Sequence, residues 1–348
     1  MLSALDLKSQ ILKYSNEFLA IGVGAKQLAM GNASIANSED VTAAYWNPAG
    51  LVKLKSKIQF GLMHSEYFAG IAKYDYGAIG IKFDSLSAGA ISLIRFGVDD
   101  IPNTTQLIDA NGNVNYDKIS KFNATDFATI ISYSKKLPKL KGIDIGGSVK
   151  IVRRKIGDFA NSWGFGIDAG LNYELTKNWK FSIVGRDITG TFNAWTYTLD
   201  ENTKNVFALT GNDIPRNNVE VTVPRLISGI SNSKLFWKNK IQLITELDFT
   251  ATFDGKRNTL IKSNLLSIDP SIGIELSYIR LIYLRFGINN YQTNKDIYYR
   301  ISRTIQPNMG IGIKYRSISL NYALTNLGNV SISPYSHIFS LNLDLNKK

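Results

Sequence analysis

The sequence predicts an all-β fold, a 14-stranded antiparallel transmembrane β-barrel with an N-terminal plug (hatch) segment inside its lumen. Three observations support this prediction. Apolar and polar residues alternate with the period of a β-strand from about residue 57 onward. Most of the alternating runs reach or exceed the roughly 9–11 residues that a tilted strand needs to cross a bilayer. The links between the runs alternate between short and long, as turns and loops do in outer-membrane barrels.

The chain begins with a segment, residues 1–56, that precedes the first expected strand. This segment is rich in small residues, which allow close packing against a wall, and it contains Asn47-Pro48 and Gly50, which favour a turn. A wall of fourteen strands is too wide for its own side chains to fill, because about eight strands is the limit. We therefore divide the chain into a plug segment, residues 1–56, and a barrel, residues 57–348. Without a plug, such a barrel would be a pore.

The first sixteen residues do not have the features of a signal peptide, because Asp6, Lys8 and Lys13 interrupt any apolar core. Two interpretations are open: a cytoplasmic protein, or a numbering that begins after a removed signal. The barrel pattern favours the second, so we expect the protein in the outer membrane of a Gram-negative cell, in contact with outer-membrane lipid.

The alternation is clearest in residues 163–174, where Trp163 and Phe165 share one face with the other apolar residues, and Gly164 and Asp168 lie on the opposite face. The expected strands are residues 57–65, 70–83, 88–97, 125–136, 142–154, 163–174, 179–188, 219–231, 239–251, 270–278, 281–291, 307–315, 317–326 and 336–346.

Every second link between these strands is short, and the intervening links are long apart from residues 66–69. The short links are 84–87, 137–141, 175–178, 232–238, 279–280 and the junction at Arg316, and the long ones are 98–124, 155–162, 189–218, 252–269, 292–306 and 327–335. A soluble sandwich has no reason to sort its loops by length. A β-propeller would show a sequence repeat of roughly 40–50 residues, and none occurs.

The two faces of the strands differ as a membrane barrel requires. Aromatic residues of the outward face lie near strand ends, which is typical of interfacial girdles: Trp163, Tyr173, Trp179, Phe253, Tyr278 and Tyr315. The lumen face carries charges of both signs, for which we expect pairing and hydration: Asp144, Lys150, Arg154, Asp168, Glu174, Arg186, Glu246, Asp248, Glu275, Arg285 and Lys314.

Composition excludes several classes of function. Hydrophobic residues make up 44% of the chain, too many for a disordered protein. The absence of cysteine excludes a disulfide scaffold, a thiolate zinc site and a cysteine nucleophile. Only two histidines, His64 and His337, are present, so we expect no metal site and no cofactor. The net charge of +12 is not concentrated in a basic helix, so we expect no nucleic-acid partner.

Several motifs resemble one known family. They are GxGAxxLAMGNA (22–33), Glu39-Asp40, WNPAGL (46–51), YDYGAIGIKF (74–83), LIRFGVDDIPNT (93–104), KIGDFANSWGFGIDAGL (155–171), RDITGTFNAW (186–195) and PRLISGIS (224–231). Together they resemble the PorV/PorQ-like proteins of the Bacteroidota, within the FadL-type outer-membrane barrels. The resemblance covers nearly the whole chain. One departure is the end, Asn346-Lys347-Lys348, which lacks a terminal aromatic residue.

The resemblance implies a role in the type IX secretion machinery, or in the gliding machinery linked to it. The expected partners are large type IX secretion subunits or the C-terminal signal domains of cargo proteins, with lipid or detergent as a further occupant of the lumen. The residues that carry the plug motif are Gly22, Gly24, Gly31, Asn32, Tyr45, Trp46, Asn47, Pro48, Ala49 and Gly50. We expect partner binding by the long loops, through Asp99, Asp100, Ile101, Pro102, Tyr116, Phe122, Phe192, Trp195, Tyr197 and Phe207. These loops could equally fold over the barrel mouth and bury their apolar residues on each other.

Two other functions are open. A transporter of hydrophobic small molecules would need an apolar pocket under the loops and a gap in the wall, for which Pro224 could kink the strand expected at 219–231. An enzyme would need an Asp/Glu or a Ser–Lys arrangement, and the only candidate loop acids are Asp99, Asp100 and Asp158. Asp is typical of turns, where it accepts bonds from local backbone N–H groups, so we predict no catalytic residues and no hydrolase activity.

Overall fold

The computed structural model describes residues 15–107, 113–295, 300–326 and 335–346. Residues 1–14 of the expected plug lie outside the described residues. So do parts of the links expected at 98–124, 292–306 and 327–335.

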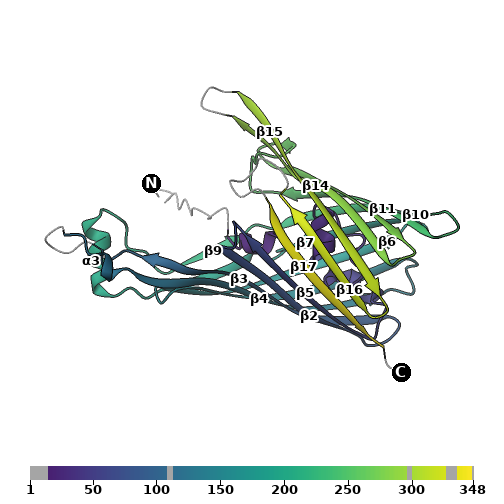
Figure 1. Ribbon diagram of the computed structural model, residues 1–348, viewed down its shortest axis with the longest axis horizontal. Helices are drawn as coiled ribbons and strands as arrows, with labels where there is room; N and C mark the ends of the chain where they lie inside the picture. Colours follow the sequence, from purple (N-terminus) through teal and green to yellow (C-terminus); the bar gives the residue numbers. More distant parts are fainter. Residues whose placement is uncertain (1–14, 108–112, 296–299, 327–334, 347–348) are drawn as a thin grey trace, which may run out of the picture.

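Fourteen antiparallel strands form a closed barrel, as the alternation predicted (Figure 1). They are β1 (Ile58–Tyr67), β2 (Ala72–Lys82), β3 (Ser87–Asn103), β4 (Ser120–Lys136), β5 (Ile143–Ile156), β6 (Ala160–Glu174), β7 (Trp179–Arg186), β10 (Arg225–Phe236), β11 (Ile241–Thr252), β13 (Ser267–Tyr278), β14 (Ile282–Lys295), β15 (Ile301–Tyr315), β16 (Ile318–Thr325) and β17 (Ser336–Leu345). The first and last strands close the wall, with Ile58 opposite Leu345 and Glu66 opposite His337.

Two faces separate along each wall strand because successive side chains point to opposite sides. Trp163 and Tyr173 of β6 are exposed on the outside, while Asp168 of the same strand is buried. Asp144 and Glu275 are likewise buried. The predicted division into an outward aromatic face and an inward charged face is confirmed at these positions.

The prediction of one continuous strand over 219–231 is wrong. Residues on either side of Pro224 belong to β9 (Asn218–Thr222) and to the wall strand β10. Pro224 has no N–H for a ladder bond, so the strand breaks there. β9 pairs with β8 (Thr191–Tyr197), and β8 pairs with the outer half of β6, whose inner half pairs with β7.

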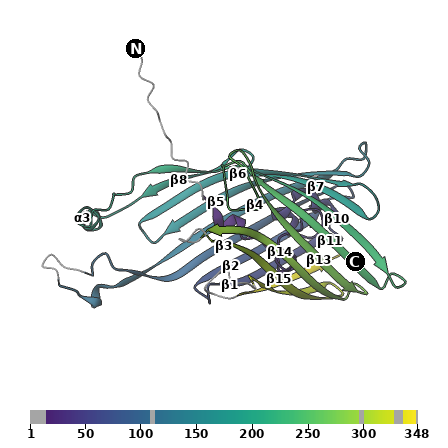
Figure 2. The ribbon, with the colours of Figure 1, turned by 90° about the horizontal axis from the view of Figure 1, so that it is seen from above.

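The links expected as long loops at 98–124 and 189–218 contain regular secondary structure. β3 and β4 continue beyond the barrel as a paired ribbon, followed by a short 3-10 helix, η3 (Tyr116–Lys118). The second link contains β8, β9 and the helix α3 (Glu201–Leu209). Figures 1 and 2 show both ribbons reaching far past the barrel end, with α3 near their tip. A further short strand, β12 (Ile261–Lys262), pairs with the start of β13. We call the β3–β4 ribbon and residues 188–224 the extracellular extension.

Residues 15–56 lie inside the barrel and are almost entirely buried (Figures 1 and 2). They contain four short helices, η1 (Glu17–Ala20), α1 (Ala25–Ala29), α2 (Ala43–Trp46) and η2 (Pro48–Lys53). Among the described residues, no helix is long and apolar enough to cross a membrane. We call residues 15–56 the N-terminal segment.

Glycines on the inner wall allow this segment to approach the strands closely. A Cβ atom on Gly287 of β14 would lie 2.0 Å from the carbonyl carbon of Met30, and one on Gly146 of β5 would lie 2.5 Å from that of Pro48. Neither position can hold a side chain unless the backbone of the N-terminal segment moves, because ordinary contacts between carbon atoms are roughly 3.5–4.0 Å.

Candidate functional site

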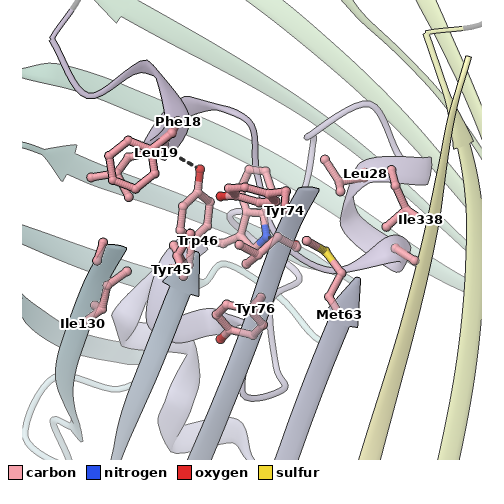
Figure 3. Close-up of a cluster of buried hydrophobic side chains, with 14 of the residues drawn as sticks. Phe18, Leu19, Leu28, Tyr45, Trp46, Met63, Tyr74, Tyr76, Ile130 and Ile338 are labelled. Carbon is pink, nitrogen blue, oxygen red and sulfur yellow. Dashed lines mark hydrogen bonds between the residues drawn. The ribbon is translucent and has the colours of Figure 1, made fainter. Parts of the chain in front are cut away.

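The N-terminal segment and the wall share one apolar cluster in the middle of the lumen (Figure 3). Phe18, Leu28 and Trp46 pack against Tyr74 of β2 and Ile130 of β4. All five side chains are buried, so contact with the wall stabilises a segment whose helices are too short to be stable alone.

Hydrogen bonds within the segment fix the aromatic residues of the cluster. Tyr45 Oη donates to Leu19 O over 2.7 Å, a bond drawn in Figure 3, and Trp46 Nε1 donates to Val23 O over 2.8 Å. The polar ends of both rings are therefore satisfied inside the barrel, which burial requires.

The predicted plug-motif residues adopt the special geometry that their types allow. Gly22, Gly24, Gly31 and Asn32 all have positive φ, between 64° and 101°. That region is open to glycine and tolerated by asparagine. The remaining motif residues are buried: Tyr45, Trp46, Asn47, Pro48, Ala49 and Gly50.

Asn47 connects three parts of the structure. Its amide donates to Ile35 O at 3.0 Å and to Asn172 Oδ1 of β6 at 2.6 Å, while its own Oδ1 accepts from Ala49 N at 3.1 Å. Next to it, a Cβ atom on Gly50 would lie 1.9 Å from a carbonyl oxygen, so only glycine fits there. These contacts explain the residue types of the motif; a functional role for it stays a prediction.

Two acidic side chains of β11 bind the backbone of the N-terminal segment. Asp248 Oδ2 accepts from Ser34 N at 2.8 Å and from Ile35 N at 3.2 Å, and Glu246 Oε1 accepts from Ala36 N at 2.6 Å. Both acids, predicted only as lumen charges, therefore hold the segment to the wall.

A second ionic contact lies nearer the periplasmic end. Glu39 Oε1 accepts from Lys180 Nζ of β7. Burial alone would raise the pKa of the Glu39 carboxyl, but Lys180 outweighs burial and holds that pKa below its usual value. Its neighbour Asp40 accepts from Thr42 N at 2.9 Å, so the Glu39-Asp40 pair divides between the wall and its own segment.

The loop after β7 begins with an ionic cluster, close to where the pairing of β6 changes from β7 to β8. Asp187 accepts from Lys150 Nζ, which also lies 2.8 Å from Asp168 Oδ1, and Arg225 Nη2 lies 3.4 Å from Asp187 Oδ2. Burial alone would raise the pKa of Asp187, but Lys150 and Arg225 outweigh burial and lower that pKa to about 2. Nearby, Arg186 donates to Tyr45 O at 3.0 Å, with its guanidinium 4.6 Å from the Tyr45 ring centre.

Two neighbouring cavities lie beside the start of the N-terminal segment. The first, the aromatic chamber, has a volume of about 420 Å³ and is lined by Phe18, Ile21, Tyr67, Phe68 and Phe96. The polar residues of its lining are Glu17, Asn290, Gln306, Thr325, Asn326 and Ser336. The second, the polar chamber, has a volume of about 470 Å³. Its lining includes Arg186, Arg225, Asp248, Thr252, Arg257, Asp269, Asn289 and Asn308. Ile21 and Tyr67 line both, so the two chambers are neighbours.

A smaller cavity of about 140 Å³ lies towards the periplasmic turns and is lined by Lys26, Glu39, Lys55 and Arg285. Helix α1 carries Lys26 on this cavity and Leu28 on the polar chamber. Two side chains of one short helix therefore line different cavities.

The residues predicted to bind a partner are spread over the extracellular extension. Asp99, Asp100, Ile101 and Pro102 lie on β3, Phe122 on β4, Tyr116 on η3, Phe192, Trp195 and Tyr197 on β8, and Phe207 on α3. Tyr116 is 73% exposed, whereas Trp195 is buried with Arg154 5.0 Å from its ring centre. Burial therefore describes Trp195, and the role of these residues in partner binding stays a prediction. Phe122 packs edge-on against Phe159 at 5.2 Å, and Trp195 stacks with Tyr197 at 6.1 Å, so some of the predicted rings pack against neighbouring rings.

The loop acids considered for catalysis each face a lysine. Asp99 lies 3.1 Å from Lys73, and Asp100 lies 3.4 Å from Lys121. Asp158 lies 3.2 Å from Lys155, three residues earlier in the chain. These distances describe ordinary surface ion pairs.

The sequence did not predict which residues line the aromatic chamber. Phe18 and Ile21 come from the N-terminal segment, Tyr67 and Phe68 from the end of a hairpin, and Phe96 from an inward position of β3. Phe96 lies on the same face of β3 as Ile94, so the alternation could have predicted that it points into the lumen. Nothing in the spacing brings Ile21 beside it.

No protein-family model matches the sequence, and no curated protein matches it. Among solved structures, the chain is similar to the CymD monoaromatic hydrocarbon channel, at 13% identity and a TM-score of 0.57 over 94% of this chain and 98% of that one. It is also similar to the toluene transporter TbuX of Ralstonia pickettii, at 13% and 0.55 over 93% and 99%. A FadL homologue of Pseudomonas aeruginosa gives 11% and 0.50 over 92% and 97%.

The fold is that of a FadL-type outer-membrane barrel. The predictions of this fold and of a place in the outer membrane are thereby confirmed. At these identities the likeness concerns the fold alone, and it does not bear on the PorV/PorQ-like resemblance or on an origin in the Bacteroidota, which stay predictions.

Proposed function

We propose that this barrel passes hydrophobic small molecules across the outer membrane. The observation that carries the proposal is the aromatic chamber, a cavity inside the lumen with four aromatic side chains and Ile21 in its lining and a size suited to a small ligand. Two of the similar structures are named as a monoaromatic hydrocarbon channel and a toluene transporter, which supports the same reading. No step of the proposal needs a catalytic residue, a metal or a cofactor.

We also propose that residues 1–56 act as the plug. The chambers lie on the extracellular side of α1 and α2, and the smaller cavity lies on the periplasmic side. A ligand in the aromatic chamber would therefore reach the periplasm only if the N-terminal segment moved, or leave sideways through the wall.

Uptake of radiolabelled toluene by cells with and without the protein tests the proposal. Ile21→Asp places a charge where both chambers meet, so we expect uptake to fall at least tenfold towards the rate of cells lacking the protein. Leu209→Asp is the matched control, because Leu209 is 87% exposed on α3 and lies far from the lumen. Equal uptake with and without the protein would refute the proposed function.

A second candidate function is the binding of a protein partner, as the resemblance to type IX secretion proteins implies. The favouring observation is the exposure of large apolar residues on the extracellular extension, including Tyr116, Leu209 and Val219. The similar structures named above give this role no support. Deleting residues 198–213 and measuring binding of a purified cargo C-terminal signal domain tests it, and unchanged binding would count against this surface.

A further inference from the structure

The outer surface of the wall is hollowed across β15–β17 and β1–β4, in a groove with a volume of about 710 Å³. We call this hollow the outer-wall groove. Gly77 of β2 lies between its ladder partners Leu62 of β1 and Leu93 of β3, and its missing side chain deepens the groove there. The large apolar residues of the lining are exposed on the outside of the barrel: Leu62, Leu93, Ile311, Ile313, Leu320 and Phe339.

Ionisable side chains also line this groove. His64 Nδ1 lies 2.6 Å from Asp75 Oδ1, and Arg95 Nη1 lies 3.2 Å from Asp75 Oδ2. Their neighbours along the strands, such as Tyr74 and Ile94, are buried on the inner face, so these three side chains point outward. Three connected ionisable groups therefore border an apolar surface that faces lipid.

The groove has a polar end near the cell surface and an apolar end within the membrane. His64 and Asp75 each lie four residues from the turn at 68–71, which is about 13 Å along a strand. Ala72, next to that turn, pairs with Val98 of β3, which continues into the extracellular extension. In the opposite direction the apolar lining reaches Ile313, two residues before the end of β15. This arrangement matches a lipid whose head group lies at the extracellular rim.

The charges near the polar end are of both signs, and one carboxylate lacks a cationic partner. Lys73 lies 3.1 Å from Asp99, and Arg95 contacts Asp75 as described above. Glu66 lies two residues beyond His64 on the same face of β1, with more than half of its side chain exposed. Among the described residues, its only basic neighbour within 4 Å is His64 Nε2, at 3.9 Å.

This distribution of charge favours a head group that carries both signs. A head group with only negative charge would be repelled by the unpaired carboxylate of Glu66. A phosphate joined to an ammonium group can instead contact Arg95 through its oxygen atoms and Glu66 through its nitrogen. Such a head group also gives polar partners to charges on the outside of a barrel, where contact with acyl chains is costly.

We propose that the outer-wall groove binds one phosphatidylethanolamine molecule. Its ammonium group lies at Glu66, its phosphate at Arg95, and one of its acyl chains passes over Gly77. The inference goes beyond the proposed function, because this site lies on the lipid-facing surface and is independent of the ligand of the chambers.

Native mass spectrometry of the full chain in detergent micelles tests the proposal. Delipidated protein is mixed with equal amounts of phosphatidylethanolamine and phosphatidylglycerol, which carry the same acyl chains and differ in the ammonium group. We expect one retained phosphatidylethanolamine per barrel and a preference of about fivefold over phosphatidylglycerol, the upper range for one exposed ion pair. Equal retention of the two lipids, retention of neither, or stronger retention of lipopolysaccharide in a third arm would overturn the proposal.

Glu66→Gln tests the head-group contact, because it removes the unpaired carboxylate with little change in size. The preference for phosphatidylethanolamine should disappear. Asp158→Asn is the matched control, since the Asp158 side chain is 99% exposed in the loop after β5 and lies outside the groove. An unchanged preference in Glu66→Gln, or the same loss in both variants, would refute the role of Glu66.

Gly77→Phe tests the acyl-chain contact by filling the groove. A Cβ atom at Gly77 would lie 3.7 Å from Leu62 Cδ2, an ordinary contact, so the wall can accept a side chain there. Retention of both lipids should fall several-fold, and heat-modifiable migration in gels checks that the variant folds. Wild-type lipid retention by folded Gly77→Phe would show that no acyl chain occupies the groove.

Discussion

Replacing Gly287 by valine should release the N-terminal segment from the wall. A Cβ atom at this position would lie 2.0 Å from Met30 C, 2.2 Å from Gly31 N and 2.4 Å from Met30 O. All three atoms are backbone, so no side-chain rotation can relieve the contact. Restoring an ordinary separation of roughly 3.5 Å requires the end of α1 to withdraw by about 1.5 Å.

The cost falls on the N-terminal segment and not on the barrel. Valine is favoured in strands, and Gly287 is paired on both sides, with Gly273 of β13 and Asn308 of β15. Overpacking typically costs about 1–3 kcal/mol, and here that energy opposes the docking of α1 against β14–β16. We therefore expect a leak through the lumen.

Swelling of proteoliposomes in small sugars measures that leak, and limited proteolysis reports whether the segment has become accessible. Gly77→Val is the matched control, since a Cβ on Gly77 of β2 would lie 3.7 Å from Leu62 Cδ2, an ordinary contact on the outer face. Wild-type swelling and protease resistance in Gly287→Val would refute the argument that backbone approach at this glycine keeps the segment docked.

Two further predictions concern movement and pH. Ala25 N donates to Ser340 Oγ of β17 at 3.2 Å, and the chain has no cysteine, so an Ala25→Cys/Ser340→Cys pair should cross-link specifically. Oxidation should abolish toluene uptake and a reductant should restore it; unchanged uptake in the oxidised protein would show that the ligand leaves without movement of the segment. Asp187 has a pKa of about 2, below the value near 3.9 of an unfolded chain, so its ion pairs stabilise the fold above about pH 4 and cease to do so as the pH falls through 2. Asp187→Asn should therefore lower the free energy of unfolding by about 2 kcal/mol at pH 7. The difference between variant and wild type should shrink below pH 4. Thermal unfolding of the barrel measures it, and a difference that stayed constant from pH 7 to pH 2 would contradict this account.

The sequence by itself determined the barrel. Alternation along β6 separated Trp163 and Phe165 from Asp168 without any tertiary information, because a strand places successive residues on opposite faces. Link lengths identified which end carries the turns. Both signals are local, and a lipid-facing wall requires them at every strand.

Details at the ends of the strands depended on tertiary contacts. β3 and β4 continue past the membrane because they pair with each other. The sequence of one strand alone does not indicate which strand it pairs with. The proline at position 224 could have predicted that the strand expected at 219–231 is divided there. The pairing of β6 with both β7 and β8 could not, because it depends on where a distant hairpin docks.

The lumen shows the same division most clearly. From the sequence, glycines such as Gly146 and Gly287 are small residues of the inner face, and nothing indicates which atoms they approach. Only the folded chain shows that the backbone at Pro48 and Met30 lies against them, and that Ile21 meets Tyr67 at the junction of two chambers. Periodicity determines which face a residue occupies, because it is a property of neighbouring residues. The partner across the lumen is decided by the docking of a segment far away in the sequence, so only the tertiary structure defines the chambers and what they can bind.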